Sequence, residues 1–188
     1  YSSKIIIELM KKNKLKVFDI KNSMINGGST RYFISHDNSK FKIQTRKISN
    51  ILKEEIKFKL EKKVTFLRFF KQINLIKRKI MSLLNKIVKN KKTIHGYGAS
   101  TKGNVLLQYF GINKKYLNFI AERNPLKYNK FTPGTYIKII SEKKSRQLKP
   151  NYYFVLPWHF KKEFLKREKK FLNSGGKMIF PLPKLKIF

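Results

Sequence analysis

The hydrophobic pattern of residues 92–188 limits most narrowly what this chain can fold into. Short apolar runs typical of buried strands alternate there with segments whose apolar residues recur at helical spacing. We expect strands at 93–97, 116–121, 136–140, 152–156 and 177–180, and helices at 102–110 and 160–173. Such alternation implies a parallel sheet covered by helices and joined by right-handed crossovers. The sequence therefore predicts an α/β fold with a Rossmann-like parallel sheet and flanking helices over 92–188.

The first 91 residues divide into two further parts. A helix at 3–12 precedes strands at 15–20 and 30–35, which a loop ending in Gly27-Gly28 joins, most simply as an antiparallel pair. This β-hairpin cannot bury its own apolar face, so residues 1–40 read as the end of a larger α/β sheet. Residues 41–91 form a predicted helical connector with helices near 48–60 and 64–90. Its apolar stripe, interpreted as core packing, comprises Phe66, Phe69, Phe70, Ile73, Ile76, Ile80, Leu83, Leu84 and Ile87.

Charge and composition exclude several classes of site. The net charge of +35 comes mainly from lysines spread along the whole chain, and A/T-rich codons account for them without a partner. Only non-specific nucleic-acid binding is therefore expected. The chain has no cysteine and three histidines far apart in sequence, so we expect no metal site. No run approaches the roughly 20 apolar residues of a membrane span, so we expect no membrane partner and a cytoplasmic location.

A glycine-rich segment, HGYGASTKGN at 95–104, follows the first strand of the Rossmann-like part. A strand, a glycine turn and a helix form the context in which helix N–H groups bind phosphate, and Glu122 ends the next strand. However, Thr101 stands where a dinucleotide fingerprint has its third glycine, and Lys102 precedes Gly103 instead of following it as in a Walker loop. A turn that only lets strand and helix pack closely is an equally good interpretation.

Four ordered motifs resemble the C-terminal domain of the sugar C-methyltransferases: GYGASTKGNVLLQYFGI, ERNPLKYNKFTPGTYIKI, KPNYYFVLPWHFKKE and GGKMIFPLP. The upstream segment LKVFDIKNSMINGGSTRYFISH is similar to the end of their methyltransferase domain. The resemblance implies a methyltransferase-domain remnant at 1–40, the connector at 41–91 and the C-terminal domain at 92–188. It also implies the substrate-side part of an S-adenosylmethionine-dependent enzyme acting on a nucleotide-linked keto-deoxysugar.

The same resemblance implies how the chemistry is distributed. The catalytic residues and the adenosylmethionine site are expected upstream of Tyr1, so the isolated chain should bind no cofactor and be inactive by itself. The expected partners are the sugar nucleotide and the N-terminal methyltransferase portion, in cis or in trans. The alternative is a basic nucleic-acid-associated protein or a stand-alone nucleotide-binding module. The candidate substrate-binding residues are Arg31, Gly96, Gly98, Lys102, Gly103, Glu122, Trp158 and His159.

Overall fold

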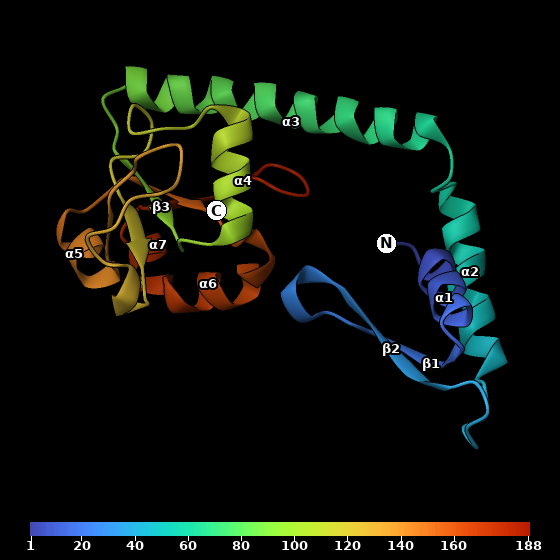
Figure 1. Cartoon of the computed structure of the whole chain (residues 1–188). Helices are drawn as coiled ribbons and strands as arrows, with labels where there is room; N and C mark the ends of the chain where they lie inside the picture. Colours follow the sequence, from blue (N-terminus) through green and yellow to red (C-terminus); the bar gives the residue numbers. More distant parts are fainter. The chain divides into compact units, whose positions relative to one another are not determined.

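The computed structural model describes residues 1–188, which form two compact units, Tyr1–Gln72 and Ile73–Phe188 (Figure 1). The boundary falls within the longest helix, α3 (Lys63–Lys89), whose first turns belong to the first unit and whose remainder belongs to the second. The helical connector predicted at 41–91 is therefore shared between the two units.

The first unit packs two helices against a hairpin. α1 (Ser3–Lys12) begins after Ser2, whose hydroxyl accepts a hydrogen bond from the backbone of Ile5. β1 (Leu15–Ser23) and β2 (Ser29–His36) pair in antiparallel register, and α2 (Thr45–Phe58) follows. The predicted first helix and antiparallel hairpin are confirmed.

The first unit has a very small hydrophobic core. Val17 and Ile20 of β1 are its only buried apolar residues. A two-stranded sheet is marginally stable by itself, because one hairpin covers little apolar surface. The unit thus leaves most of its apolar side chains at its surface.

The second unit is built on a six-stranded sheet in the order β5-β4-β3-β6-β7-β8. The first five strands of this order run parallel, and β8 pairs antiparallel with β7. This mostly parallel mixed sheet with flanking helices confirms the predicted Rossmann-like fold. The strands are β3 (Ile94–Tyr97), β4 (Ile120–Glu122), β5 (Ile139–Ser141), β6 (Tyr152–Val155), β7 (Lys177–Phe180) and β8 (Lys186–Ile187).

Helices cover both faces of this sheet. The second part of α3 and α4 (Thr101–Phe110) pack on one face through a core that contains Ile80, Leu107 and Phe154. On the other face, α6 (Lys161–Arg167) and α7 (Lys169–Asn173) pack over Tyr97 and Tyr153. The remaining helix, α5 (Glu142–Gln147), connects β5 to β6. Because the helices cover the two faces, the loops at the ends of the strands are the places where a ligand-binding site can form.

The structure corrects several element predictions. The single helix predicted at 160–173 is two short helices separated at Glu168, and the strand predicted at 116–121 begins only at Ile120. The preceding residues form a turn in which Leu117 donates to the carbonyl of Asn113. The short helix α5 and the antiparallel strand β8 were not predicted.

The apolar stripe of α3 is core only in part. Ile80, Leu84 and Ile87 are buried as predicted. Phe66 and Phe69 were predicted to be core and are 58% and 62% exposed, because they lie in the first unit, where no sheet face covers them. Phe70, at 55%, is exposed as well.

Candidate functional site

The glycine loop, residues 96–103, joins β3 to α4 at the carboxyl edge of the sheet. Gly98 has a φ of 81°, and a Cβ placed on it would lie 2.7 Å from Cγ of Pro157. Gly96 and Gly103 are packed as closely, against the side chains of Ile120 and Leu156. All three glycines therefore let neighbouring strands and the helix approach the loop, as the packing interpretation required.

The loop also begins helix α4. Ser100 is its N-cap, and its hydroxyl accepts a hydrogen bond of 3.0 Å from the N–H of Gly103. The positive end of the helix dipole lies here, because the first N–H groups of a helix have no partner within it. Lys102, in the first turn, is exposed and adds a full positive charge to the same place. This end of α4 favours an anion.

Glu122 ties the end of β4 to the glycine loop. Its buried carboxylate accepts hydrogen bonds from the backbone N–H groups of Ala99, at 2.7 Å, of Arg123, at 2.9 Å, and of Asn124, at 2.8 Å. Lys127 Nζ lies 3.8 Å from the same carboxylate and donates to the carbonyl of Ala99 at 2.7 Å. The carboxylate therefore holds the loop in place, and any contact with a ligand would be additional to this role.

The turn after β6 brings a histidine to the same edge. Trp158 and His159 follow Pro157 directly, and Pro157 is the residue against which Gly98 packs. Burial lowers the pKa of His159, and the nearby positive charge of Lys102 lowers it further. The imidazole is therefore neutral near pH 7, and its Nδ1 is buried without a hydrogen-bond partner. Since this nitrogen is enclosed by protein, only the exposed part of the ring is within reach of a ligand.

The structure thus gathers most of the predicted site residues. Those at the carboxyl edge of the second unit are Gly96, Gly98, Lys102, Gly103, Glu122, Trp158 and His159. Arg31 lies on β2 of the first unit, opposite Lys21 of β1. Sequence reasoning missed Lys127, although its position after Asn124-Pro125, the turn that follows a buried strand, was a usable signal. Substrate binding by these residues stays a prediction.

A second polar cluster, also missed, lies under the helices of the opposite face. The buried Tyr97 hydroxyl donates to Glu168 at 2.7 Å and accepts from Arg167 at 2.7 Å. Arg146 pairs with Glu168 and, at 3.0 Å, with Glu142. Burial and the bond to Glu168 raise the pKa of Tyr97, so its hydroxyl keeps its proton. These groups satisfy one another and join α5, α6 and α7 to β3.

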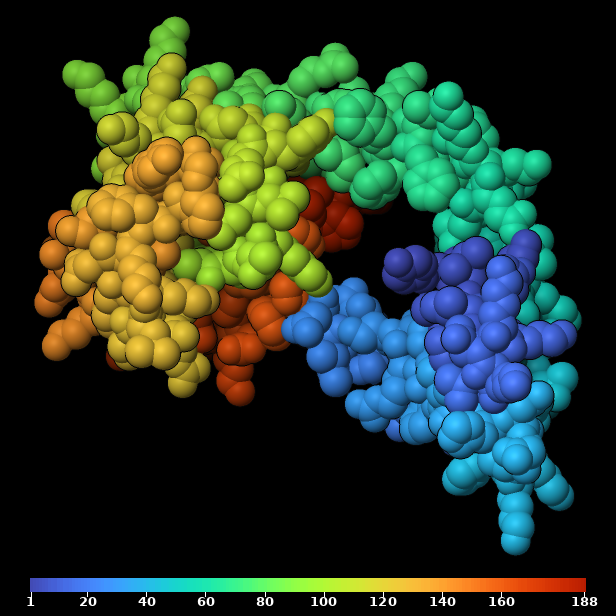
Figure 2. All heavy atoms as spheres, viewed as in Figure 1, coloured from blue at the N-terminus to red at the C-terminus, as the bar shows by residue number.

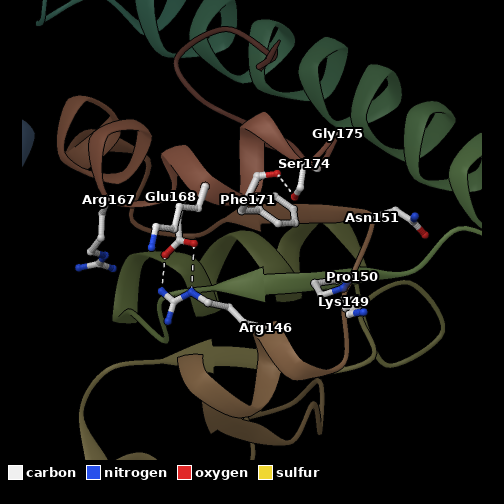
Figure 3. A pocket seen from close by; sticks show the side chains of 11 residues that line it. Arg146, Lys149, Pro150, Asn151, Arg167, Glu168, Phe171, Ser174 and Gly175 are labelled. Carbon is white, nitrogen blue, oxygen red and sulfur yellow. Dashed lines mark hydrogen bonds and ion pairs between the residues drawn. The ribbon is translucent and has the colours of Figure 1, made fainter.

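A cavity of about 690 Å³ borders this cluster (Figure 3). Pro150 and Asn151 precede β6 and Gly175 and Gly176 precede β7, so the cavity lies at the amino edge of the sheet. Figure 3 shows Arg146 reaching Glu168 at one side of it. The cavity is therefore at the opposite end of the strands from the glycine loop, and none of the predicted site residues lines it.

Two further tests concern metals and membranes. Nowhere in the structure do three side chains of the histidine, aspartate or glutamate type come together as a metal site would require. None of the helices has the combination of length and apolar composition with which a helix crosses a bilayer.

Comparison with known proteins shows which family the chain is similar to. The family model described as the C-methyltransferase C-terminal domain matches residues 24–183. The C-methyltransferase NovU of Streptomyces niveus is 28% identical to this chain over 179 residues, which make up 95% of this chain and 42% of that relative. The chain thus spans less than half the length of the curated relative that it matches.

Proposed function

The chain belongs to the family of C-methyltransferase C-terminal domains, and from this premise we propose that it forms the substrate-side part of an enzyme that methylates a carbon of a nucleotide-linked keto-deoxysugar. The family match supports the reaction class. The observation that carries the substrate class is the gathering of Lys102, His159 and the start of α4 at one edge of the sheet.

A diphosphate fits the charge of this edge. The N-terminus of α4 and Lys102 offer positive potential, and Lys127, which donates to the carbonyl of Ala99, adds a second cation beside the loop. Because Glu122 is already held by three backbone N–H groups, its negative charge is partly compensated at this edge. We assign the diphosphate of the sugar nucleotide to this place.

The sugar would then face the turn after β6. Removing a proton from the carbon next to a ketone builds negative charge on the ketone oxygen, and nearby donors or cations lower the cost of that charge. His159 is neutral and partly exposed, so the exposed part of its ring can hydrogen-bond a sugar hydroxyl or the keto oxygen. We assign His159 and Lys102 to positioning the substrate, and the base that removes the proton to the methyltransferase portion.

The residues of this chain do not fit adenosylmethionine. A ribose diol needs a carboxylate with free acceptor positions at the end of the second strand, and Glu122 has its oxygens bonded to Ala99, Arg123 and Asn124. The space beside the glycines of the loop is filled by the side chain of Ile120 on β4 and by those of Leu156 and Pro157, which follow β6. We therefore propose that the cofactor is held by the methyltransferase portion, and titration of this chain with adenosylmethionine should give no heat above background.

The test is a Lys102→Ala variant titrated with a nucleoside-diphosphate-linked keto-deoxysugar by calorimetry. Loss of a charged hydrogen bond should weaken binding by about 1–3 kcal/mol. Lys92→Ala is the matched control, since Lys92 is an exposed lysine that precedes β3 and therefore lies at the amino edge of the sheet. Equal losses in the two variants, or no binding by the unsubstituted chain, would contradict the proposal.

A further inference from the structure

The cavity at the amino edge of the sheet has no part in the proposed function. Its volume of about 690 Å³ lies within the range of about 300–1,000 Å³ that small-molecule sites occupy. The buried Pro150 and the half-buried ring of Phe171 make part of its wall apolar (Figure 3). Helix α5, which carries Arg146, lies at the surface of the second unit on the face that Figure 2 shows, so a ligand can reach the cavity from solvent.

The side-chain oxygens around this cavity already accept hydrogen bonds from the protein. Glu168 accepts from the hydroxyl of Tyr97, at 2.7 Å, and from Nε of Arg146, at 3.2 Å. Oδ1 of Asn151 accepts from the N–H of Thr93 at 2.9 Å. A ligand therefore finds few free acceptors among these side chains.

The carbonyl groups at the two helix ends beside the cavity are bonded as well. At the end of α5 the carbonyl of Arg146 accepts from the N–H of Lys149 at 3.1 Å. At the end of α7 the carbonyl of Phe171 accepts from the N–H of Gly176, at 3.0 Å, and from the hydroxyl of Ser174, at 2.9 Å. These bonds offset the negative partial charge that the end of a helix would turn toward an anion.

The donors around the cavity, in contrast, are not all used. Arg146 bonds its carboxylate partners through Nε and Nη2, and its Nη1 donates to no acceptor of the protein. The ammonium groups of Lys149 and Lys170 form no ion pair. The amide nitrogen of Asn151 remains a free donor, because Oδ1 is the atom that Thr93 bonds. The cavity thus offers donors to a ligand that supplies acceptors.

Arginine distinguishes this cavity from the basic surface of the chain in general. Lysines occur throughout the sequence, whereas there are only seven arginines, and both Arg146 and Arg167 line this cavity. Glu168 is the only anionic residue among those that line it. Arginine binds phosphate through several N–H groups at once, and a phosphate dianion presents only acceptors.

We infer that this cavity binds a small phosphate monoester, at a site separate from the glycine loop. The phosphate would lie at Arg146, Lys149 and Lys170, and the organic part of the ester would lie against Pro150 and Phe171. Inorganic phosphate should bind more weakly, because it makes no contact with this apolar wall.

The experiment titrates the ¹⁵N-labelled chain with glucose 6-phosphate at physiological salt and follows the amide signals by NMR. The signals of Gly175 and Gly176, which line the cavity, should shift in a saturable way. Those of Gly98 and Gly103, in the glycine loop, should not. Inorganic phosphate should move the same two signals but saturate at a higher concentration.

Two pairs of variants test the charge of the cavity. Lys149→Gln/Lys170→Gln should weaken binding by about tenfold or more, because charge-assisted hydrogen bonds are lost. Lys53→Gln/Lys57→Gln removes the same charge from α2 of the first unit and should stay within about twofold, since salt screens distant charges. Ser174→Glu should weaken binding by about tenfold relative to Ser174→Gln, which has nearly the same shape without the charge. All of these side chains are exposed, and circular dichroism checks that each variant is folded.

Several results would overturn this inference. They are the absence of saturable binding, shifts at Gly98 and Gly103 in place of Gly175 and Gly176, and equal losses in the two lysine pairs. Tighter binding of citrate would assign the cavity to carboxylates, and displacement of the ester by an oligonucleotide at physiological salt would assign it to nucleic acid. None of these variants touches the glycine loop, so sugar-nucleotide titration of the same chains tests the proposed function separately.

Discussion

At the scale of single residues, Gly98 meets two constraints at once. Its φ of 81° lies in the left-handed region, and Pro157 fills the space in which a Cβ would stand. Gly111, which ends α4, has a similar φ of 76° but no atom within 4 Å of an added Cβ. A substitution at Gly111 therefore tests backbone strain alone, whereas one at Gly98 tests backbone strain together with steric packing.

We expect Gly111→Ala to lower the free energy of unfolding by about 1–2 kcal/mol, the usual cost of the left-handed region for an L residue. Gly98→Ala should cost about 1–3 kcal/mol more, because the methyl group overpacks against Pro157. Urea unfolding followed by the fluorescence of Trp158, the only tryptophan, reports on the second unit. Equal losses for the two variants would show that the loop moves freely away from Pro157.

At the scale of elements, a buried hydrogen-bond chain joins α5 to two strands. His95 of β3 lies 2.8 Å from the hydroxyl of Ser145 on α5, which lies 3.1 Å from the hydroxyl of Tyr153 on β6. His95 is 3% exposed, and burial lowers its pKa from 6.5 to about 4. The folded chain therefore keeps this imidazole neutral where the unfolded chain protonates it.

Because the pKa of His95 is lowered in the folded state, the free energy of unfolding should fall as the pH falls. Between pH 6.5 and about 4 the unfolded state binds a proton that the folded state does not. The contribution of His95 is thus fully present above pH 6.5 and is lost as the pH falls through that window, by about 3 kcal/mol in all. His95→Asn should flatten the fall in unfolding free energy between pH 7 and 4.5, relative to the unsubstituted chain.

The control for this measurement is His36→Asn, because His36 is exposed at the end of β2 and bonds nothing in the core. It should leave the pH dependence unchanged. If the unfolding free energy of His95→Asn had the same pH dependence as that of the unsubstituted chain, the imidazole would be protonated inside the folded unit. The description of the buried hydrogen bonds from His95 through Ser145 to Tyr153 would then be wrong.

At the scale of the whole molecule, the net charge of +35 sets how the chain meets polyanions. Lysines are distributed over both units and are not gathered on one segment. We expect binding to DNA and RNA that is indifferent to sequence and falls steeply with salt, since counterion release supplies it. A filter-binding titration in which one sequence is preferred at physiological salt would contradict this.

How much of the fold the sequence could predict follows from how local each signal is. The helix at 3–12, the hairpin and the strand–loop–helix around Gly96–Gly103 depend on spacing within a few residues, and they were predicted correctly. The break at Glu168 was not, and the side chain at this break bonds Tyr97, 71 positions away, and Arg146. The hydrophobic periodicity of a segment does not show which distant residues its side chains will contact.

The same division applies to the candidate site. The sequence by itself determined that a glycine loop and the residues after β4 and β6 would share one edge of a parallel sheet, because strand direction fixes which ends meet. Only the tertiary structure decided that the Glu122 carboxylate is occupied by backbone N–H groups and that His159 keeps an unpartnered nitrogen. It also decided that the apolar stripe of α3 is covered at Ile80 and exposed at Phe66. Hydrophobic spacing shows which face of a helix is apolar, whereas burial depends on which elements the rest of the fold brings against that face.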